Sequence, residues 1–108
     1  MYRNSTSAIC RIAAGGTQST EIRIADYAFA MLKMPAAAVG TVFTLEGRLF
    51  EEDEFEAILD SDDTPLSINF TASKKIRIPD AAFGCFSIRL VSDASETAGL
   101  SLPVRLTA

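Results

Sequence analysis

Eight carboxylates crowd one short stretch of this chain, Leu49 to Asp63, which reads LFEEDEFEAILDSDD and contains no basic residue. Such a cluster could bind a cation, supply the acid and the nucleophile of a glycosidase, or form a charged turn. A calcium loop of the EF-hand type needs a glycine at its bend and a glutamate at its twelfth position. The segment that begins at Asp60 has neither, so the sequence favours a β-turn. A cation site at Asp60, Asp62 and Asp63 is the lesser alternative.

Catalysis by these carboxylates is not indicated. Glycosidases hold two carboxyl groups in a cleft, one of them in apolar surroundings that raise its pKa. Glu51, Glu52, Asp53 and Glu54 are instead a run of like charges at a turn. The chain has no histidine, which excludes Ser-His-Asp and Cys-His arrangements, and the glycine pair in AAGGTQST lacks the spacing of a phosphate-binding loop. We therefore expect a protein that is not an enzyme and uses no cofactor or metal.

The composition also argues against several classes of partner. The net charge is −4 and the bases are scattered, apart from Lys74 and Lys75, so a nucleic-acid surface is not indicated. No apolar run approaches the roughly 20 residues that span a bilayer, and the first residues lack the apolar region of a signal peptide. We expect no membrane partner and a protein that stays in the cytoplasm where it is made. Cys10 and Cys85 are expected to be two buried thiols rather than a disulfide or a zinc site.

Charge is divided unevenly along the chain. Residues Glu46 to Asp63 hold nine acids and one base, Arg48, for a net charge of −8, whereas the remaining residues hold five acids and nine bases. Two electrically distinct regions could favour head-to-tail contacts between copies, or docking on a charged lattice. An equally weighted alternative is that the acids merely fall in one hairpin.

Alternation of apolar and polar residues with a period of two predicts strands throughout. Short clusters of turn residues separate them. Pro103 predicts that the last strand lies at a sheet edge, or that its amide position points away from a neighbour. The pattern indicates one all-β domain over residues 1–108, an antiparallel sandwich or barrel with eight or nine short strands, and we expect an antiparallel β-sandwich of jelly-roll type. Residues 1–7 are expected to be flexible or ordered by a partner. The predicted strands are 7–12, 20–25, 28–34, 41–50, 54–60 (for which a short helix is the alternative), 66–70, 73–79, 86–92 and 100–106.

The order of these features resembles a family of small β-sandwich structural proteins from the virions of tailed bacteriophages. The resemblance rests on a DY…L.MPAA segment that begins at Asp26 and ends at Ala37, an F.LEG strand, a hairpin leading into F..I.D, and an F.IRLVS strand before an alternating terminal strand. It covers roughly residues 20–107. Relatives often carry a Ser-Pro-Asp-Gly-like turn where this chain has Glu51 to Glu54, so the turn type here is expected to differ.

The resemblance implies a virion component, with a head decoration (cement) protein on the exterior of the capsid as the first expectation. Its partner would be the phage major capsid protein, and copies would form a dimer or trimer there. Two hypotheses concern the contacts. The N-terminal segment, including Met1, Tyr2, Arg3 and Asn4, would order on the shell, and the acidic run Glu51, Glu52, Asp53 and Glu54 would pair with basic positions of a neighbouring copy, such as Arg23, Lys74, Lys75 or Arg77.

Two alternatives stay open. The protein could be a tail or head-to-tail accessory protein, in which a sandwich of this type serves as an adaptor. It could also be a sugar-binding module on the virion surface, although the chain has no Trp and its only tyrosines are Tyr2 and Tyr27.

Overall fold

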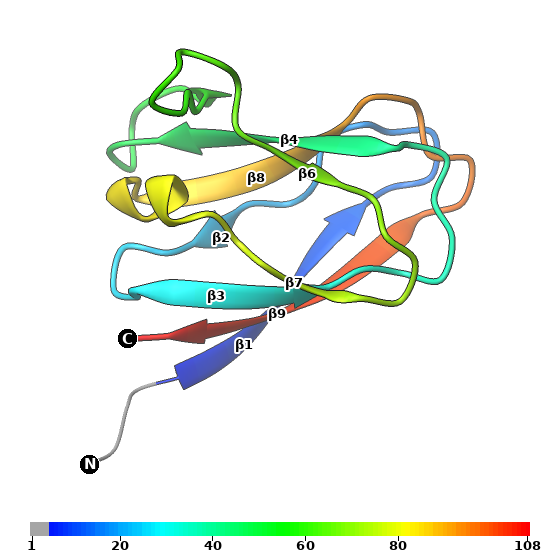
Figure 1. The fold of residues 1–108 in the computed structure, drawn as a ribbon, viewed down its shortest axis with the longest axis horizontal. Helices are drawn as coiled ribbons and strands as arrows, with labels where there is room; N and C mark the ends of the chain where they lie inside the picture. The colour runs from blue at the N-terminus through cyan, green and yellow to red at the C-terminus, as the bar shows by residue number, and fades with distance from the viewer. Residues whose placement is uncertain (1–4) are drawn as a thin grey trace.

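Alternating buried and exposed side chains build two antiparallel sheets that face each other across one apolar core (Figure 1). The computed structural model describes residues 5–108. A 3₁₀ helix, Asp80–Gly84, forms within the segment predicted as a turn. The strands of the described residues are β1 (Ser5–Ile12), β2 (Ile22–Arg23), β3 (Phe29–Lys33), β4 (Val42–Arg48), β5 (Glu56–Ala57), β6 (Ser67–Asn69), β7 (Lys75–Arg77), β8 (Ser87–Ser92) and β9 (Leu100–Thr107).

Strand order confirms the predicted antiparallel β-sandwich. One sheet has the order β1-β9-β3-β7, and the other has the order β2-β8-β4-β5, with β6 also paired to β4. Strands that follow each other in the chain mostly lie in opposite sheets, so the two sheets are wound together, as in a jelly roll, rather than built one after the other. Each observed strand falls within or overlaps a segment that the alternation predicts.

The core is made by the inward faces of both sheets. On β9 every second residue from Leu100 to Leu106 is buried, and on β4 the buried positions include Phe43 and Leu45. Branched and aromatic side chains suit this pleated, half-buried environment, which explains why the alternation is so regular. Residues with less than 2% exposure include Ile12, Ile24, Leu32, Met34, Ile78, Ile88, Leu90 and Leu102.

Pro103 does not mark an edge strand, because β9 lies between β1 and β3. The ladder with β3 runs from Thr107 to Val104 and stops next to Pro103. On the other side Pro103 faces Ile9, whose carbonyl accepts a hydrogen bond from Thr20 Oγ1 at 3.5 Å. Pro103 therefore occupies a position where the sheet needs no amide donor, which is the second of the two predicted settings.

Two other expectations are corrected in part. Ser5, Thr6 and Ser7 are not an irregular segment, because they belong to β1 and pair with residues 105–107 of β9. In the segment 54–60 only Glu56–Ala57 forms a strand. Ile58 packs against the core while Leu59 is 50% exposed, whereas a period-two pattern would place Phe55, Ala57 and Leu59 together on the face opposite Ile58, so the prediction of a strand over the whole segment is wrong.

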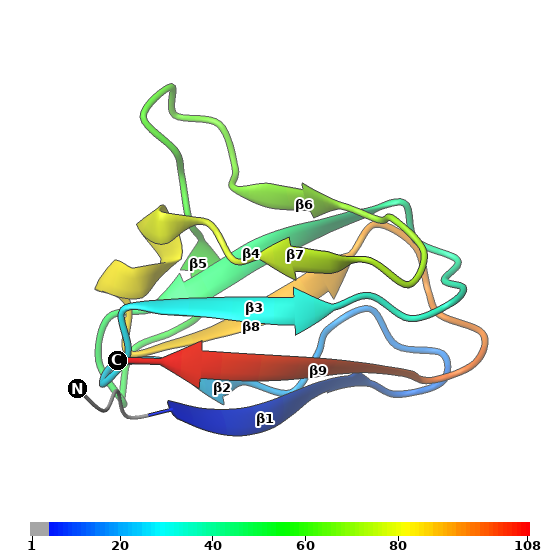
Figure 2. The ribbon, with the colours of Figure 1, turned by 60° about the horizontal axis from the view of Figure 1, so that its bottom comes forward.

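The acidic stretch is an excursion from one edge of the second sheet. β5 pairs with Glu46 and Gly47 of β4, and β6 pairs with residues 42–44 on the same strand. Leu45 N–H donates to the carbonyl of Leu66, and Ile58 N–H donates to the carbonyl of Leu45, so both sides of the excursion are tied to β4. Figure 2 shows the loop between β5 and β6 standing clear of both sheets.

Candidate interaction surfaces

The acidic end of the molecule consists of two exposed loops, residues 49–55 between β4 and β5 and residues 59–65 between β5 and β6. Glu51, Glu52, Asp53 and Glu54 are all exposed in the first loop. Three apolar side chains stand among these acids: Leu49 is 58% exposed, Phe50 is 70% exposed and Leu59 is 50% exposed. An apolar tip surrounded by carboxylates is costly in water and indicates a contact surface.

Asp53 has a structural role within the first loop. Its carboxylate oxygens accept hydrogen bonds from the backbone N–H groups of Leu49, at 3.1 Å, and Glu54, at 2.9 Å. Asp53 N–H also donates to the carbonyl of Phe50. A carboxylate that bonds nearby backbone amides can stabilise a turn that has no glycine, so the loop holds its shape without glycine.

Asp60 organises the second loop in the same way. One of its carboxylate oxygens accepts from the N–H groups of Asp62, at 2.8 Å, and Thr64, at 3.0 Å. Asp63 has a left-handed backbone with a φ of 58°. The favoured interpretation of this segment as a turn is therefore confirmed. Across residues 5–108, no three Asp, Glu, Cys or His side chains lie close enough together to bind a metal ion.

The outer face of the β1-β9-β3-β7 sheet is basic. Its four strands carry five basic residues and no acidic one, namely Arg11, Lys33, Lys75, Arg77 and Arg105, and all five are exposed. Lys33 and Lys75 lie directly opposite each other on adjacent strands. Like charges in this position destabilise a sheet. Lys74 adjoins this face at the turn before β7, so the predicted pair Lys74 and Lys75 belongs to a larger basic face.

A shallow groove of about 440 Å³ lies in this basic face. Its floor includes Ile9, which is 45% exposed, Met31, which is 37% exposed, and Pro103. Its rim includes Lys33, Lys75 and Arg105. Met31 sits opposite Arg105 on one side and Arg77 on the other. The groove is therefore an apolar strip bordered by positive charge.

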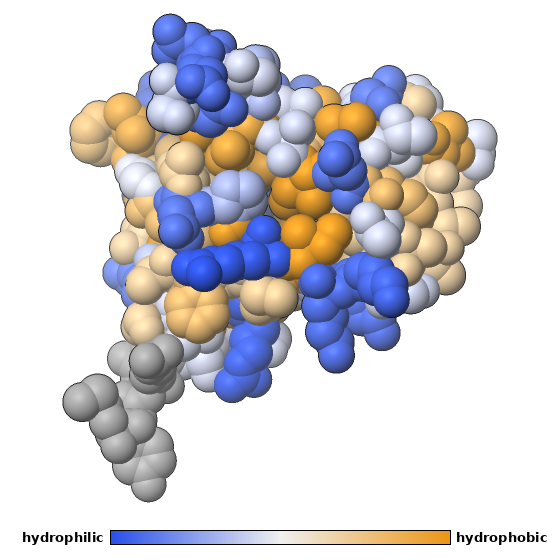
Figure 3. All heavy atoms as spheres, in the orientation of Figure 1, coloured by the Kyte–Doolittle hydropathy of each residue, from blue (hydrophilic) through white to orange (hydrophobic). Residues whose placement is uncertain are grey.

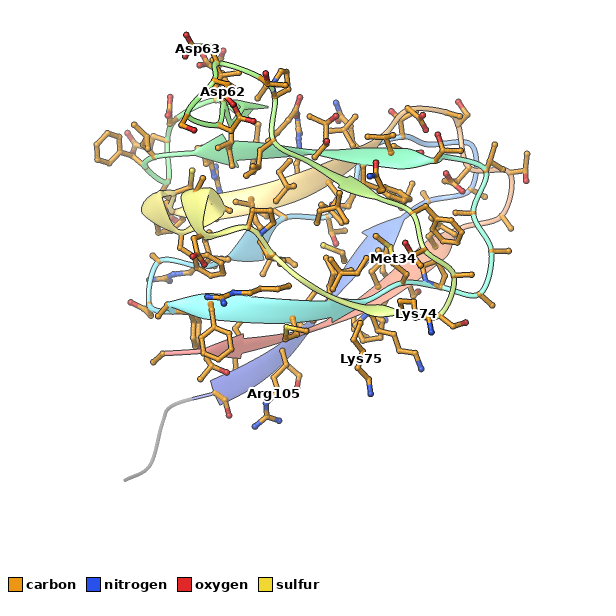
Figure 4. All side chains as sticks on the ribbon, in the orientation of Figure 1. Met34, Asp62, Asp63, Lys74, Lys75 and Arg105 are labelled. Carbon is orange, nitrogen blue, oxygen red and sulfur yellow. The ribbon has the colours of Figure 1, made fainter. Side chains whose placement is uncertain are left out.

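The acidic end and the basic face lie on opposite sides of the molecule. Figure 4 places Asp62 and Asp63 at the upper end, and Lys75 and Arg105 on the lower side. Figure 3, in the same orientation, shows hydrophilic side chains at the upper left and along the lower side, and others across the middle of this face, where they lie among apolar side chains. The fold thus separates the predicted acidic and basic sites within one chain rather than bringing them together. Met1, Tyr2, Arg3 and Asn4 lie outside the described residues, so their role stays a prediction.

Two of the basic positions expected at a copy-to-copy contact already have partners. Arg23 pairs with Asp26 at 3.7 Å and lies over the ring of Phe86. Arg77 pairs with Asp80 at 2.9 Å. In contrast, no carboxylate of residues 5–108 lies within 4.0 Å of a charged nitrogen of Arg11, Lys33, Lys74, Lys75 or Arg105. Among the described residues, the positive charge without a carboxylate partner is therefore concentrated on the side of the molecule that carries the groove.

On the outer face of the β2-β8-β4-β5 sheet, two arginines already have carboxylate partners. Arg48 pairs with Glu21 at 2.6 Å, and Arg89 pairs with Glu46 at 2.7 Å. Both guanidinium groups lie over the ring of Phe55, at 5.1 and 4.4 Å from its centre. Because ion pairs and cation–π contacts occupy both guanidinium groups, Arg48 and Arg89 offer little to a charged partner.

Sequence reasoning missed the groove, although a signal exists. In SAICRI and AFAMLKM an apolar residue occupies a position that alternation assigns to solvent: Ile9 stands between Ala8 and Cys10, and Met31 stands between Ala30 and Leu32. Consecutive apolar residues of this kind place an apolar side chain on the face of the strand that would otherwise be polar. The register of β1, β9 and β3 is needed to show that these residues are neighbours.

A buried carboxylate, that of Glu96, lies between the loop at residues 39–40 and Ser92 at the end of β8. Glu96 is 1% exposed and accepts hydrogen bonds from Val39 N–H and Gly40 N–H, both at 2.8 Å, and from Ser92 Oγ at 2.9 Å. Burial raises its pKa, but these hydrogen bonds outweigh burial and hold the pKa below its ordinary value. A Cβ on Gly40 would lie 2.0 Å from Ser92 Oγ, so this approach requires glycine.

The two thiols offer no reactive site. Cys10 and Cys85 are free, and Cys10 is buried whereas Cys85 is half-buried. Burial raises the pKa of Cys10 to about 11, against a smaller opposing effect of its hydrogen bond from Ser19. Burial also raises the pKa of Cys85. Both thiols are therefore protonated at neutral pH and are poor nucleophiles.

Comparison with known proteins yields an informative likeness among solved structures. No protein-family model and no curated protein sequence matches this chain. Among solved structures, the crystal structure of the SPBc2 prophage-derived protein YomS is similar, with a TM-score of 0.68 and 16% sequence identity. The likeness covers 100% of this chain and 96% of that one. At this identity it establishes a shared all-β fold. Within residues 5–108 there is also no helix with the length and apolar character that crossing a membrane requires.

Proposed function

We propose that this chain is a structural protein of a bacteriophage virion, and that it decorates the capsid by binding the lattice of the major capsid protein. The observation that carries the proposal is the likeness to YomS, a prophage-derived protein, over nearly the whole of both chains. The sequence resemblance to β-sandwich virion proteins supports the same class independently of that structure.

The surfaces described above suit a protein that acts by binding. The sandwich is a rigid support, and its exposed features are an apolar acidic tip and a basic groove rather than a deep cleft. On a symmetric lattice many weak contacts add up, because each bound copy holds the next binding group at high local concentration. A small domain with shallow binding surfaces can therefore remain attached to a shell.

The opposed charged surfaces favour a second candidate, an adaptor at the tail or at the junction of head and tail. Complementary surfaces on opposite sides of a subunit generate closed rings when the rotation between subunits closes, and a ring suits the axis of a tailed particle. Sugar binding receives less support, because Tyr27 is half-buried and packs against the core instead of presenting an open ring.

Copy number distinguishes the two candidates. We would purify virions from the phage that carries this gene and measure the ratio of this chain to the major capsid protein by quantitative mass spectrometry with isotope-labelled peptides. Decoration predicts copies in the hundreds, in a simple ratio to the capsid protein, and an adaptor predicts dozens or fewer. Absence of the chain from virions purified to a constant ratio of DNA to capsid protein would refute both.

A further inference from the structure

Exposed apolar side chains are concentrated in two places on this molecule. Among residues 5–108, six large apolar side chains are exposed, and five of them lie either in the groove or on the acidic end. Ile9 and Met31 belong to the groove, whereas Leu49, Phe50 and Leu59 belong to the acidic end. Single exposed apolar residues are ordinary, but two clusters inside charged borders indicate contact surfaces.

The charges around the two clusters are opposite in sign. Glu51, Glu52 and Glu54 follow the apolar tip, and no basic side chain of the described residues pairs with them. Lys33, Lys75 and Arg105 border the groove without a carboxylate partner in residues 5–108. Bringing the surfaces together would place carboxylates beside the opposed pair Lys33 and Lys75, and would relieve the repulsion between them.

One copy cannot make this contact with itself. The acidic end projects from the edge of one sheet at β5 and β6, as Figure 2 shows, and the groove lies on the outer face of the other sheet, on the far side of the core. Asp53 and Asp60 also fix the two acidic loops by hydrogen bonds to their own backbone. The partner for each surface must therefore be another molecule.

We propose that the groove binds the acidic end of a second copy of this chain, with the Leu49–Phe50 tip of one copy against Ile9, Met31 and Pro103 of the next. The contact is heterologous, because two different surfaces meet, so it produces a head-to-tail ring or an open chain. It deepens the proposed function by assigning the contact between neighbouring subunits. It does not depend on which virion site they occupy.

The contact is small, so its affinity in solution is expected to be modest. A shallow groove that receives two side chains belongs at the low end of known interface sizes. On a shell or a ring, neighbouring copies would be held close together, and a weak contact would then be occupied. Concentrated protein is consequently required to observe it in free solution.

The test uses two variants that each lose one surface. Phe50→Ser removes the tip and keeps the groove, whereas Met31→Glu places a negative charge in the groove and keeps the tip. Val39→Ser is the matched control, because Val39 is the sixth exposed apolar residue, at 49%, and lies in neither surface. Sedimentation velocity on the full chain, over a concentration series up to about the millimolar range where contacts of roughly −4 kcal/mol are populated, gives the association state. Circular dichroism and thermal melting verify that each variant is folded. If Met31→Glu does not fold, Ile9→Glu is used in its place.

Wild type and Val39→Ser are expected to associate with rising concentration, and Phe50→Ser and Met31→Glu to remain monomeric. Mixing the two monomeric variants should restore a contact that stops at a one-to-one dimer, since only one working tip and one working groove remain. A monomeric wild type at every concentration, unchanged association of Phe50→Ser, or a mixture that stays monomeric would each overturn the inference. These outcomes are separate from the copy number in virions, which tests the proposed function.

Discussion

Glu96 is the one charged residue among residues 5–108 that lies in the interior. Its side chain bonds the 39–40 turn and Ser92, while its backbone N–H donates to the carbonyl of Gly16 and its carbonyl accepts from Gly15. Three loops that are distant in sequence therefore meet at one residue, two of them at its carboxylate and the third at its backbone. Nearby, Asp93 accepts from Thr41 N–H and Thr41 Oγ1, which hold the pKa of Asp93 below its ordinary value.

Replacing Glu96 should destabilise this end of the molecule. Glutamine offers one acceptor oxygen, so in Glu96→Gln the amide group would face donors that the second carboxylate oxygen now satisfies. Buried donors left without a partner cost about 1–3 kcal/mol each, and we expect a loss of roughly 2–3 kcal/mol in the free energy of unfolding. Urea unfolding would measure it. Ser95→Ala, an exposed change in the same loop, is the control and should be neutral.

The effect of Glu96 should depend on pH in a defined direction. Because the pKa is lower in the folded than in the unfolded chain, ionised Glu96 contributes its full stability above the ordinary value of 4.5, and this contribution is lost as the pH falls through the folded pKa. The difference in unfolding free energy between wild type and Glu96→Gln should accordingly narrow below pH 4.5. A difference that stays constant from neutral to acidic pH would contradict this account.

At the scale of the elements, period-two alternation predicted the strands well where one face is buried along the whole strand. β9 is the example, since every second residue from Leu100 to Leu106 is apolar and buried. The pattern says which side of a strand faces the core but not which strand lies beside it. For this reason the central place of β9 was unpredictable from Pro103, and the groove formed by Ile9, Met31 and Pro103 required the register.

The prediction of a strand over residues 54–60 was wrong for a different reason. Its alternation would place Phe55, Ala57 and Leu59 on one face, but the excursion leaves the sheet after Ala57. Ile58 packs against the core, and its backbone is hydrogen-bonded to Leu45. The turn at Asp60 was predictable, because Asp, Ser and Thr residues before Pro65 are typical of turns. The hydrogen bonds from the loop backbone to Asp53 could not be predicted, since nothing in the sequence distinguishes it from the other three acids of the run Glu51 to Glu54.

Asp53 and Glu52 provide a charge-matched pair for testing the first loop. Asp53→Ala and Glu52→Ala each remove one negative charge, but only Asp53 accepts backbone hydrogen bonds there. We expect faster amide hydrogen exchange at Leu49 and Glu54 in Asp53→Ala, by roughly 3–10-fold for a lost net contribution of about 1 kcal/mol, and little change in Glu52→Ala. Equal exchange rates in both variants would show that Asp53 does not hold the loop.

On the scale of the whole molecule, the two sheets have different surfaces. On the β2-β8-β4-β5 sheet, Arg48 and Arg89 pair with glutamates, and both guanidinium groups lie over the ring of Phe55. The β1-β9-β3-β7 sheet leaves its bases around an apolar groove, opposite the end that carries the acidic loops. The uneven charge of the sequence therefore places negative charge on one side of the folded protein and positive charge on the other. This arrangement suits a subunit that repeats in an ordered assembly.

Cryo-electron microscopy of intact virions tests the central claim, that this chain is a virion structural protein on the capsid, most directly. The account predicts density for this sandwich at symmetric positions outside the shell, in contact with the major capsid protein. Density restricted to the portal or tail would replace decoration with the adaptor role. Particles of complete composition with no density for this fold at any site would contradict the account as a whole.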